Sequence, residues 1–180
     1  MRRRKIMGSD RKRLLVVVDM QKDFTDGSLR TAEAQAIVPA VVKKIQKRME
    51  EGWEAVFTQD THFDNYLETL EGRNLPVVHC VKGTPGWELV PELSGFPGKR
   101  FEKSTFGSTE LAVYARNGDY EEVEIVGVCT DICVLANSIL IRTVLPGAQV
   151  SVDSACCAGV SPESHRNALD AMKMCQITVV

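Results

Sequence analysis

Three residues with chemically active side chains stand at or just after the ends of apolar segments that are typical of buried strands. They are Asp19, Asp60 and Cys133. Parallel strands present their carboxyl ends at one edge of a sheet, where ligand crevices form, so these side chains are expected to meet there. Their convergence is the strongest physical indication of a functional site in the sequence.

Cys133 closes the segment Gly-Val-Cys-Thr-Asp-Ile-Cys at residues 127–133. If Thr130 caps the helix that follows, Cys133 lies in its first turn, where free N–H groups and the helix dipole favour a thiolate. The same N–H groups could hold an oxyanion. Two alternatives remain open at this point: a small buried hydrophobe, or a redox pair with Cys129. The spacing of the two cysteines lacks the two-residue gap of the usual redox motif.

Asp19 leaves a buried strand, and a carboxylate in that place can act as general acid and base when burial or a nearby charge tunes its pKa. A loop-capping aspartate would explain the same residue. Lys103, within residues 101–106, would by itself be interpreted as a surface lysine.

The sequence Asp60-Thr61-His62, with His79 further along the chain, offers oxygen and nitrogen ligands for zinc, manganese or iron. Glu68 stands six residues after His62 and could add a fourth ligand. Two of the three histidines in the chain fall in this segment. Solvated or core histidines would account for them equally well.

Alternating strand and helix patterns predict a three-layer α/β/α fold around a mostly parallel, six-stranded sheet. Pro39 sets the expected start of the first long helix and Gly52 its end. The long stretch 61–100, rich in glycine and proline, is expected to be functional. The predicted strands are 14–18, 55–58, 100–102, 123–128, 149–152 and 176–180, and the predicted helices are 39–51, 108–117, 130–144 and 162–174.

The remaining reactive side chains are expected to be structural. Cys156 and Cys157 should lie in the loop after the fifth strand, with no assigned role, and His165 should be solvated at the start of the last helix.

Composition sets broad limits on the protein. Its 180 residues suit one domain, assigned to residues 14–180, after a basic and disordered extension at 1–13. A net charge of −2 gives no reason to expect a nucleic-acid partner. No apolar run approaches the ~20 residues of a membrane span. The six cysteines, without a secretory signal, indicate free thiols in a reducing cytoplasm.

Taken together, these segments resemble the isochorismatase-like cysteine hydrolases, and within them the nicotinamidases. The resemblance covers nearly the whole chain, from residue 14 to 180. Four motifs in the same order are far more specific than any one of them. The matching segments are 17–24, 60–62, 76–80, Lys103 and 127–134.

The resemblance implies a catalytic triad of Asp19, Lys103 and Cys133 on an isochorismatase-like, Rossmann-like fold. It also implies a cis peptide bond between Val128 and Cys129. The backbone N–H groups of Cys129 and Cys133 would then form the oxyanion hole.

The same resemblance implies a metal site at Asp60, His62 and His79, with Glu68 where some family members supply a further ligand. The ion would be divalent, zinc first, with manganese or iron as alternatives. It would orient the substrate rather than generate the nucleophile.

The implied reaction is hydrolysis of nicotinamide to nicotinate and ammonia, through a cysteine thioester, in pyridine nucleotide salvage. Many nicotinamidases place a tryptophan shortly before the last metal histidine, but residues 74–78 contain none. Phe24 and Phe106 are therefore the candidates for contact with the substrate ring.

Three alternatives stay open. The first is another cysteine amidohydrolase of this family acting on a different small amide or carbamoyl substrate; the others are a non-enzymatic module and a redox protein. Family members are often oligomeric, so a homo-oligomer fits the resemblance, although no interface signature stands out in the sequence.

Overall fold

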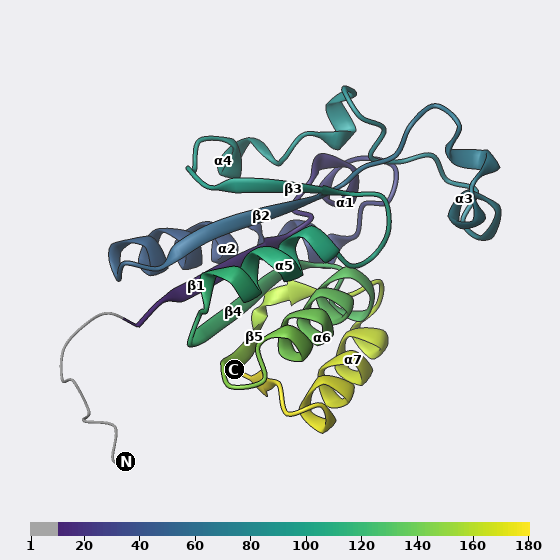
Figure 1. Cartoon of the computed structure of the whole chain (residues 1–180). Coiled ribbons are helices and arrows are strands. Elements are labelled where there is room, and N and C mark those ends of the chain that lie inside the picture. Colours follow the sequence, from purple (N-terminus) through teal and green to yellow (C-terminus); the bar gives the residue numbers. More distant parts are fainter. Residues whose placement is uncertain (1–10) are drawn as a thin grey trace, which may run out of the picture.

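The computed structural model describes residues 11–180, and its centre is one sheet of six strands (Figure 1). All neighbouring strands pair in parallel. In the sheet the strands follow the order β3-β2-β1-β4-β5-β6. The strands are β1 (Arg13–Val18), β2 (Glu54–Asp60), β3 (Lys99–Lys103), β4 (Glu122–Val128), β5 (Gln149–Ala158) and β6 (Thr178–Val179).

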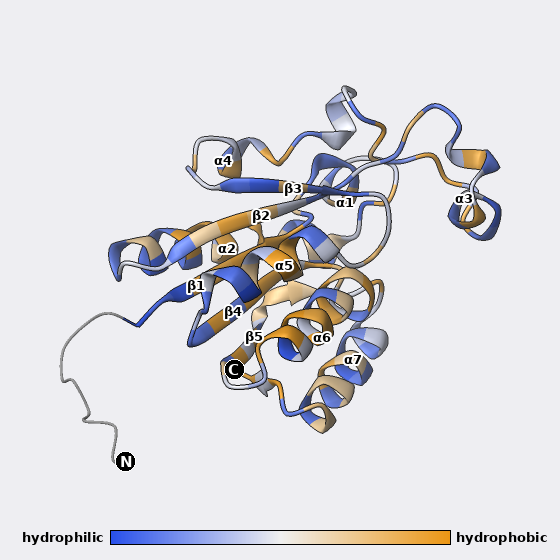
Figure 2. Cartoon of the chain, in the orientation of Figure 1, coloured by the Kyte–Doolittle hydropathy of each residue, from blue (hydrophilic) through white to orange (hydrophobic). Residues whose placement is uncertain are grey.

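Helices cover both faces of this sheet, which explains why β1 is apolar at every position after Arg13. Leu14 and Val16 belong to the core on the face of α5 (Thr109–Gly118), α6 (Leu135–Val144) and α7 (Pro162–Met174). Leu15 and Val17 belong to the core under α2 (Ala32–Glu50). Successive side chains of a strand point to opposite faces, so a strand covered on both sides needs a continuous apolar run. Figure 2 shows these apolar strands between helices with hydrophilic outer faces. The predicted α/β/α architecture is confirmed.

The order of the strands creates a crevice beside β1. The chain runs from β1 outward to β2 and β3, then crosses back to place β4 on the other side of β1. Crossovers that leave in opposite directions open a gap at the carboxyl ends of the two central strands, where ligands bind in folds of this kind. Asp19 and Cys129 directly follow β1 and β4 at this point.

The stretch between β2 and β3 contains short elements that the sequence did not reveal. In Figure 1, α3 stands out beyond the carboxyl edge of the sheet, whereas α4 lies near the start of β3. These elements are the 3-10 turns η1 (Tyr66–Glu68) and η2 (Pro85–Trp87) and the helices α3 (Leu70–Asn74) and α4 (Pro91–Ser94). A short helix α1 (Lys22–Thr25) follows β1.

The predicted start of the first long helix, near Pro39, is wrong by about two turns. Helix α2 begins at Ala32, because Thr31 caps it by accepting a hydrogen bond from the N–H of Ala34 at 3.0 Å. Ala34 and Val38 are buried in the core beneath the helix. A proline inside a helix removes one backbone hydrogen bond, and this cap and packing offset that loss.

Two further predictions need correction. Thr130 does not cap the helix after β4; it opens a wide π-type turn, η3 (Thr130–Val134), that leads into α6. Strand β5 also runs on to Ala158, so Cys156 and Cys157 lie in the strand and are buried, rather than in a loop after it. Continued pairing with β4 explains the longer strand, because Cys157 lies opposite Gly127.

The predicted N-terminal extension falls mostly outside the described residues. Residues 1–10 are not among them, and Arg13 already belongs to β1. Among residues 11–180, no helix has both the length and the apolar character needed to cross a membrane.

Candidate active site

The carboxyl edge of the sheet brings together the three predicted catalytic side chains. Asp19 follows β1, Lys103 is the last residue of β3, and Cys133 lies in the turn after β4. Asp60, the last residue of β2, lies opposite Lys103 in the parallel register. All four side chains are buried, with exposed fractions of 7% or less.

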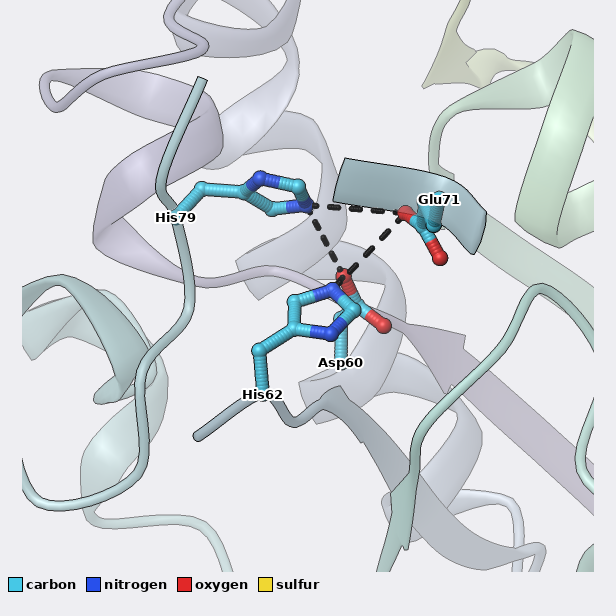
Figure 3. A group of neighbouring side chains, drawn as sticks. All are labelled: Asp60, His62, Glu71 and His79. Atoms are coloured by element: carbon cyan, nitrogen blue, oxygen red, sulfur yellow. Dashed lines mark hydrogen bonds and ion pairs between the residues drawn. The ribbon is translucent and has the colours of Figure 1, made fainter. Parts of the chain in front are cut away.

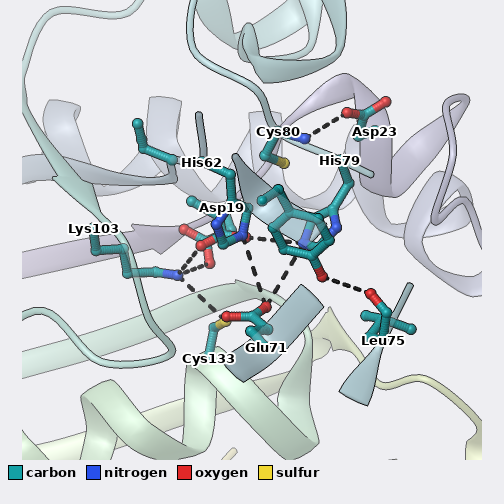
Figure 4. A network of polar contacts seen from close by, with 12 residues as sticks. Asp19, Asp23, His62, Glu71, Leu75, His79, Cys80, Lys103 and Cys133 are labelled. Atoms are coloured by element: carbon teal, nitrogen blue, oxygen red, sulfur yellow. Dashed lines mark hydrogen bonds and ion pairs between the residues drawn. The ribbon is translucent and has the colours of Figure 1, made fainter. Parts of the chain in front are cut away.

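Lys103 contacts the other three side chains of this group, and Figure 4 shows its contacts with Asp19 and Cys133. Its Nζ lies 2.7 Å from Asp19 Oδ2 and 3.3 Å from Asp60 Oδ1. It also donates a hydrogen bond to Cys133 Sγ at 3.4 Å. The other oxygen of Asp19 accepts a hydrogen bond from the Thr58 hydroxyl at 2.6 Å. Lysine, carboxylate and thiol therefore form one connected group, as predicted for a triad.

Burial dominates the electrostatics of this group. It raises the pKa of Asp19, and the neighbouring charge of Lys103 only partly opposes this effect. Burial also raises the pKa of the Cys133 thiol well above its usual value, and the nearby Asp19 carboxylate adds to the rise. Burial opposes the charge of Lys103 as well, but Asp19, Cys133 and Asp60 raise its pKa well above the usual value.

The expectation of a thiolate favoured by the start of a helix is therefore wrong for the free protein. Cys133 lies within the η3 turn, and its burial outweighs any favourable dipole, so that the neutral thiol is preferred. A base is needed to take the thiol proton, and the adjacent Asp19 carboxylate is placed to accept it.

A second group of polar side chains lies beside the triad and shares Asp60 with it (Figure 3). One ligand atom from each of four residues lies within 4.8 Å of the others: Asp60, His62, Glu71 and His79. Asp60 Oδ2 is 3.0 Å from His62 Nε2 and 3.3 Å from His79 Nε2. Glu71 Oε1 is 3.7 Å and 3.9 Å from the same two nitrogens.

The donor set fits a divalent metal ion. His79 Nδ1 lies 2.8 Å from the carbonyl oxygen of Val77, and His79 Nε2 faces the carboxylates of Asp60 and Glu71. With its proton on Nδ1, this ring would offer Nε2 to a metal ion. Two imidazole nitrogens with two carboxylate oxygens suit zinc, manganese or iron. Burial opposes ionisation of Asp60, but hydrogen bonds from His62 and His79 and the charge of Lys103 hold its pKa below the usual value. The sequence reasoning found three of these four residues.

The fourth carboxylate differs from the predicted one. Glu68 is exposed in η1, whereas Glu71 in α3 turns toward the histidines. Thr69 caps α3 by accepting a hydrogen bond from the N–H of Gly72 at 2.9 Å, and this one-turn helix aims Glu71 inward. Spacing from His62 alone carried no signal for this choice.

Aromatic rings border the metal-type group. Phe24 is buried, with its ring centroid 6.0 Å from that of His79. Tyr66, which the sequence reasoning missed, packs against His62 and His79 with centroid distances of 4.6 Å and 5.0 Å. Phe106 is 45% exposed. A cavity of about 320 Å³ opens here, and its lining includes His62, Phe63, Tyr66, Leu70, Glu71 and Phe106. Phe24 and Phe106 remain predictions as substrate contacts.

The segment that leads to Cys133 has the backbone geometry implied by the resemblance. The peptide bond between Val128 and Cys129 is cis. The preceding Gly127 has a positive φ of 120°, and a Cβ there would lie 2.1 Å from the carbonyl oxygen of Val18. Only glycine allows β4 to approach β1 so closely at the crevice.

His165 is not simply solvated. Its Nδ1 lies 2.8 Å from the hydroxyl of Thr130, a fully buried residue next to Cys129. Asp131 in the same turn accepts a hydrogen bond from the N–H of Val160 at 3.1 Å. The segment ahead of α7 and the start of α7 therefore support the turn that carries Cys133.

Comparison with known proteins agrees with this geometry. Residues 13–180 match the model of the isochorismatase domain family. The chain is 28% identical to the nicotinamidase/pyrazinamidase of Mycobacterium tuberculosis, over 93% of this chain and 98% of that protein.

Solved structures of two related proteins are similar to this chain over nearly its whole length. The pyrazinamidase of Pyrococcus horikoshii, crystallised in complex with zinc, has a TM-score of 0.82 and 32% identity, covering 94% of this chain and 98% of that one. The pyrazinamidase/nicotinamidase of Streptococcus mutans has a TM-score of 0.84 and 28% identity, covering 94% of this chain and 100% of that one.

A family match over nearly the whole chain, with a buried Asp–Lys–Cys group at the crevice, defines a hydrolase of the isochorismatase class. The chain belongs to the isochorismatase family. Within it, the protein is an amidohydrolase related to the nicotinamidase branch.

Proposed function

We propose that this enzyme hydrolyses nicotinamide to nicotinate and ammonia, with Cys133 as the nucleophile and a divalent ion beside it. One observation supports this above all. Lys103 joins the triad to Asp60, which in turn belongs to the four-residue metal-type group, so that nucleophile and metal site share one crevice. The relatives named as nicotinamidases support the choice of substrate.

The first step is proton transfer from Cys133 to Asp19. In this transfer the negative charge moves from Asp19 to Cys133. Both groups contact Lys103 Nζ, Asp19 Oδ2 at 2.7 Å and Cys133 Sγ at 3.4 Å, so the charge stays beside the same cation. The total charge of the group does not change, so burial opposes this transfer far less than it opposes separate ionisation of the thiol. The thiolate then attacks the carboxamide carbon.

The proposed donors to the developing oxyanion are the backbone N–H groups of Cys129 and Cys133. When the tetrahedral intermediate collapses, the C–N bond breaks and Asp19 returns its proton to the departing ammonia. Asp19 next takes a proton from water, which attacks the thioester carbon. The C–S bond breaks, the acid is released and Cys133 regains its proton.

The metal-type group would hold and orient the substrate. His62, His79, Asp60 and Glu71 would bind the ion, and a bound ion would supply a Lewis-acidic contact for the ring nitrogen of nicotinamide. Phe24, packed on His79, and Phe106, in the wall of the cavity, are the proposed aromatic contacts of the ring. The product, nicotinate, would enter pyridine nucleotide salvage.

Ammonia release from nicotinamide tests the proposal directly. Zinc-loaded wild-type protein should release ammonia, whereas Cys133→Ala protein and chelator-treated protein should not. A folded, metal-loaded wild type that leaves nicotinamide intact would contradict the substrate assignment. A panel of other small amides and carbamoyl compounds would then identify the substrate of the same triad.

A further inference from the structure

A single short segment, residues 19–24, contacts both the catalytic group and the metal-type group. Asp19 belongs to the triad, and Phe24 packs on His79. Two of the polar residues between them, Gln21 and Asp23, hydrogen bond to backbone groups. Gln21 binds the backbone of Asp60, and Asp23 binds that of Cys80, the residue after His79.

Gln21 takes the place of a missing strand neighbour for Asp60. Asp19 has a positive φ of 48°, which turns the chain away from β2 at the end of β1. The described pairing of β1 with β2 stops at Val17 and Phe57. Beyond that point the side-chain amide of Gln21 accepts a hydrogen bond from the Asp60 N–H at 2.7 Å and donates one to the Asp60 carbonyl oxygen at 2.9 Å.

Gln21 is itself fixed in place. It is fully buried, and its Nε2 also donates to the carbonyl oxygen of Trp87 at 2.8 Å. Its backbone forms an antiparallel bridge with Leu89. A side chain that is held this firmly can hold both backbone groups of Asp60 in one orientation.

Asp23 does the same for the residue after His79. Its Oδ2 accepts a hydrogen bond from the N–H of Cys80 at 2.7 Å, as Figure 4 shows. Cys80 has a positive φ of 46°, a conformation that non-glycine residues adopt only when their surroundings hold them there. A Cβ on Gly86 would lie 2.3 Å from both carboxylate oxygens of Asp23, so this position leaves space for the carboxylate to bind.

We propose that Gln21 and Asp23 are positioning residues for the metal site: they fix the backbone of Asp60 and the residue next to His79, and thereby increase the affinity for a divalent cation. This inference rests on the proposed function, in which Asp60 and His79 are metal ligands. Groups that orient metal ligands commonly contribute 10- to 100-fold to metal affinity. The same segment would thus couple the placement of Asp19 to that of the ion.

Calorimetric titration of the purified full-length protein with Zn²⁺ tests the proposal without relying on activity. We expect the Zn²⁺ dissociation constant to rise about 10- to 100-fold in Gln21→Met and in Asp23→Ala. Asp23→Asn keeps an oxygen acceptor for Cys80 and should recover part of the affinity. Circular dichroism of the metal-free proteins checks that each variant is folded.

The chain offers a matched control for each residue. Gln59 is buried and also donates to the Trp87 carbonyl oxygen, at 3.1 Å, but its side chain does not pair with Asp60. Gln59→Ala should therefore bind Zn²⁺ like the wild type. Asp26 lies two residues beyond this segment and is exposed, and Asp26→Ala should also leave the affinity unchanged.

Three outcomes are decisive. Folded Gln21→Met and Asp23→Ala proteins with wild-type affinity, or an equal loss in Gln59→Ala, would overturn the positioning role. A wild type that binds no divalent ion would overturn both the metal site and the inference. A wild type that binds Zn²⁺ and shows the expected losses in the variants, yet releases no ammonia from nicotinamide, would overturn the proposed substrate and leave the positioning role standing.

Discussion

Two ionic groups in this protein combine acidic and cationic side chains and differ in what they do. The group at the carboxyl edge is buried, whereas the group under α2 is partly buried around Glu124. On the α2 face, Glu124 contacts Lys44 Nζ at 3.0 Å and Arg48 Nε at 2.6 Å, and Lys44 also contacts Asp153 at 2.7 Å. Each carboxylate there has a close cation. At the carboxyl edge, by contrast, Asp19, Asp60 and Cys133 share the one lysine, Lys103.

The difference shows in the direction of the pKa shifts. Burial opposes ionisation of Asp153, but the hydrogen bond and charge of Lys44 lower its pKa below the usual value. Burial of Asp19 has the larger effect and raises its pKa. A group with enough cations keeps its charges fixed and supports the fold. A group with too few cations leaves a proton free to move and can accept a metal ion, as catalysis requires.

The sharpest way to separate the two groups is to remove the lysine of each. Lys103→Met should lower kcat for nicotinamide by at least about 10³-fold, because members of a catalytic unit fail together. Lys44→Met should leave kcat within about twofold of the wild type, since Lys44 contacts no residue of the triad or of the metal-type group. Steady-state ammonia release measures both. Equal losses of kcat in the two variants would show that the two ionic groups do not differ in their role in catalysis.

Removal of the metal should affect stability as well as activity. A ligand present at 100 times its dissociation constant stabilises the folded state by about 2.7 kcal/mol. Chelation should therefore lower the free energy of unfolding by roughly that amount, as urea titration would show. In Asp60→Ala the chelator should have little effect, and an undiminished response there would place the ion at another site.

Loss of a cation from the ionic group under α2 should lower the free energy of unfolding. Lys44→Met leaves Glu124, with a side chain only 2% exposed, dependent on Arg48, and leaves Asp153 without this partner. We expect a loss of about 1–3 kcal/mol in the free energy of unfolding. Lys173→Met, which breaks an exposed pair with Asp170, is the control and should change stability by less than about 0.5 kcal/mol.

The smallest expected effect is a change in acid stability. Because the pKa of Asp153 is lower in the folded protein, its contribution is complete above the unfolded value of about 3.9 and is lost as the pH falls through the folded value. Asp153→Asn should therefore cost less than about 1 kcal/mol at pH 7 and nothing at the acid limit. Unfolding curves from pH 6 down to 3 measure this slope. If the free energy of unfolding of Asp153→Asn changed with pH as it does in the wild type, the charge of Asp153 would not contribute to the stability of the ionic group under α2.

Much of the fold was accessible from the sequence, because a strand buried on both faces needs a continuous apolar run and a crossover helix needs a repeating apolar face. Five of the six strands and the last helix, Pro162–Met174, were predicted close to their observed bounds, whereas β5 runs six residues beyond its predicted end. The start of α2 was predicted wrongly, because the cap at Thr31 and the packing of the first two turns outweigh the helix-breaking effect of Pro39.

The candidate site, like the fold, could be predicted from the sequence only in part. The sequence by itself indicated Asp19, Asp60 and Cys133, which stand at or after strand ends that the topology must bring together. Lys103, the last residue of β3, was indicated only by the resemblance to the isochorismatase-like hydrolases. Only the tertiary structure placed Glu71, rather than Glu68, beside His62 and His79, and placed Tyr66, Gln21 and Asp23 against residues of this four-residue group or their chain neighbours. Strand ends are placed by the repeating geometry of a sheet. A side chain in an irregular segment is placed by long-range contacts that leave no periodic trace in the sequence.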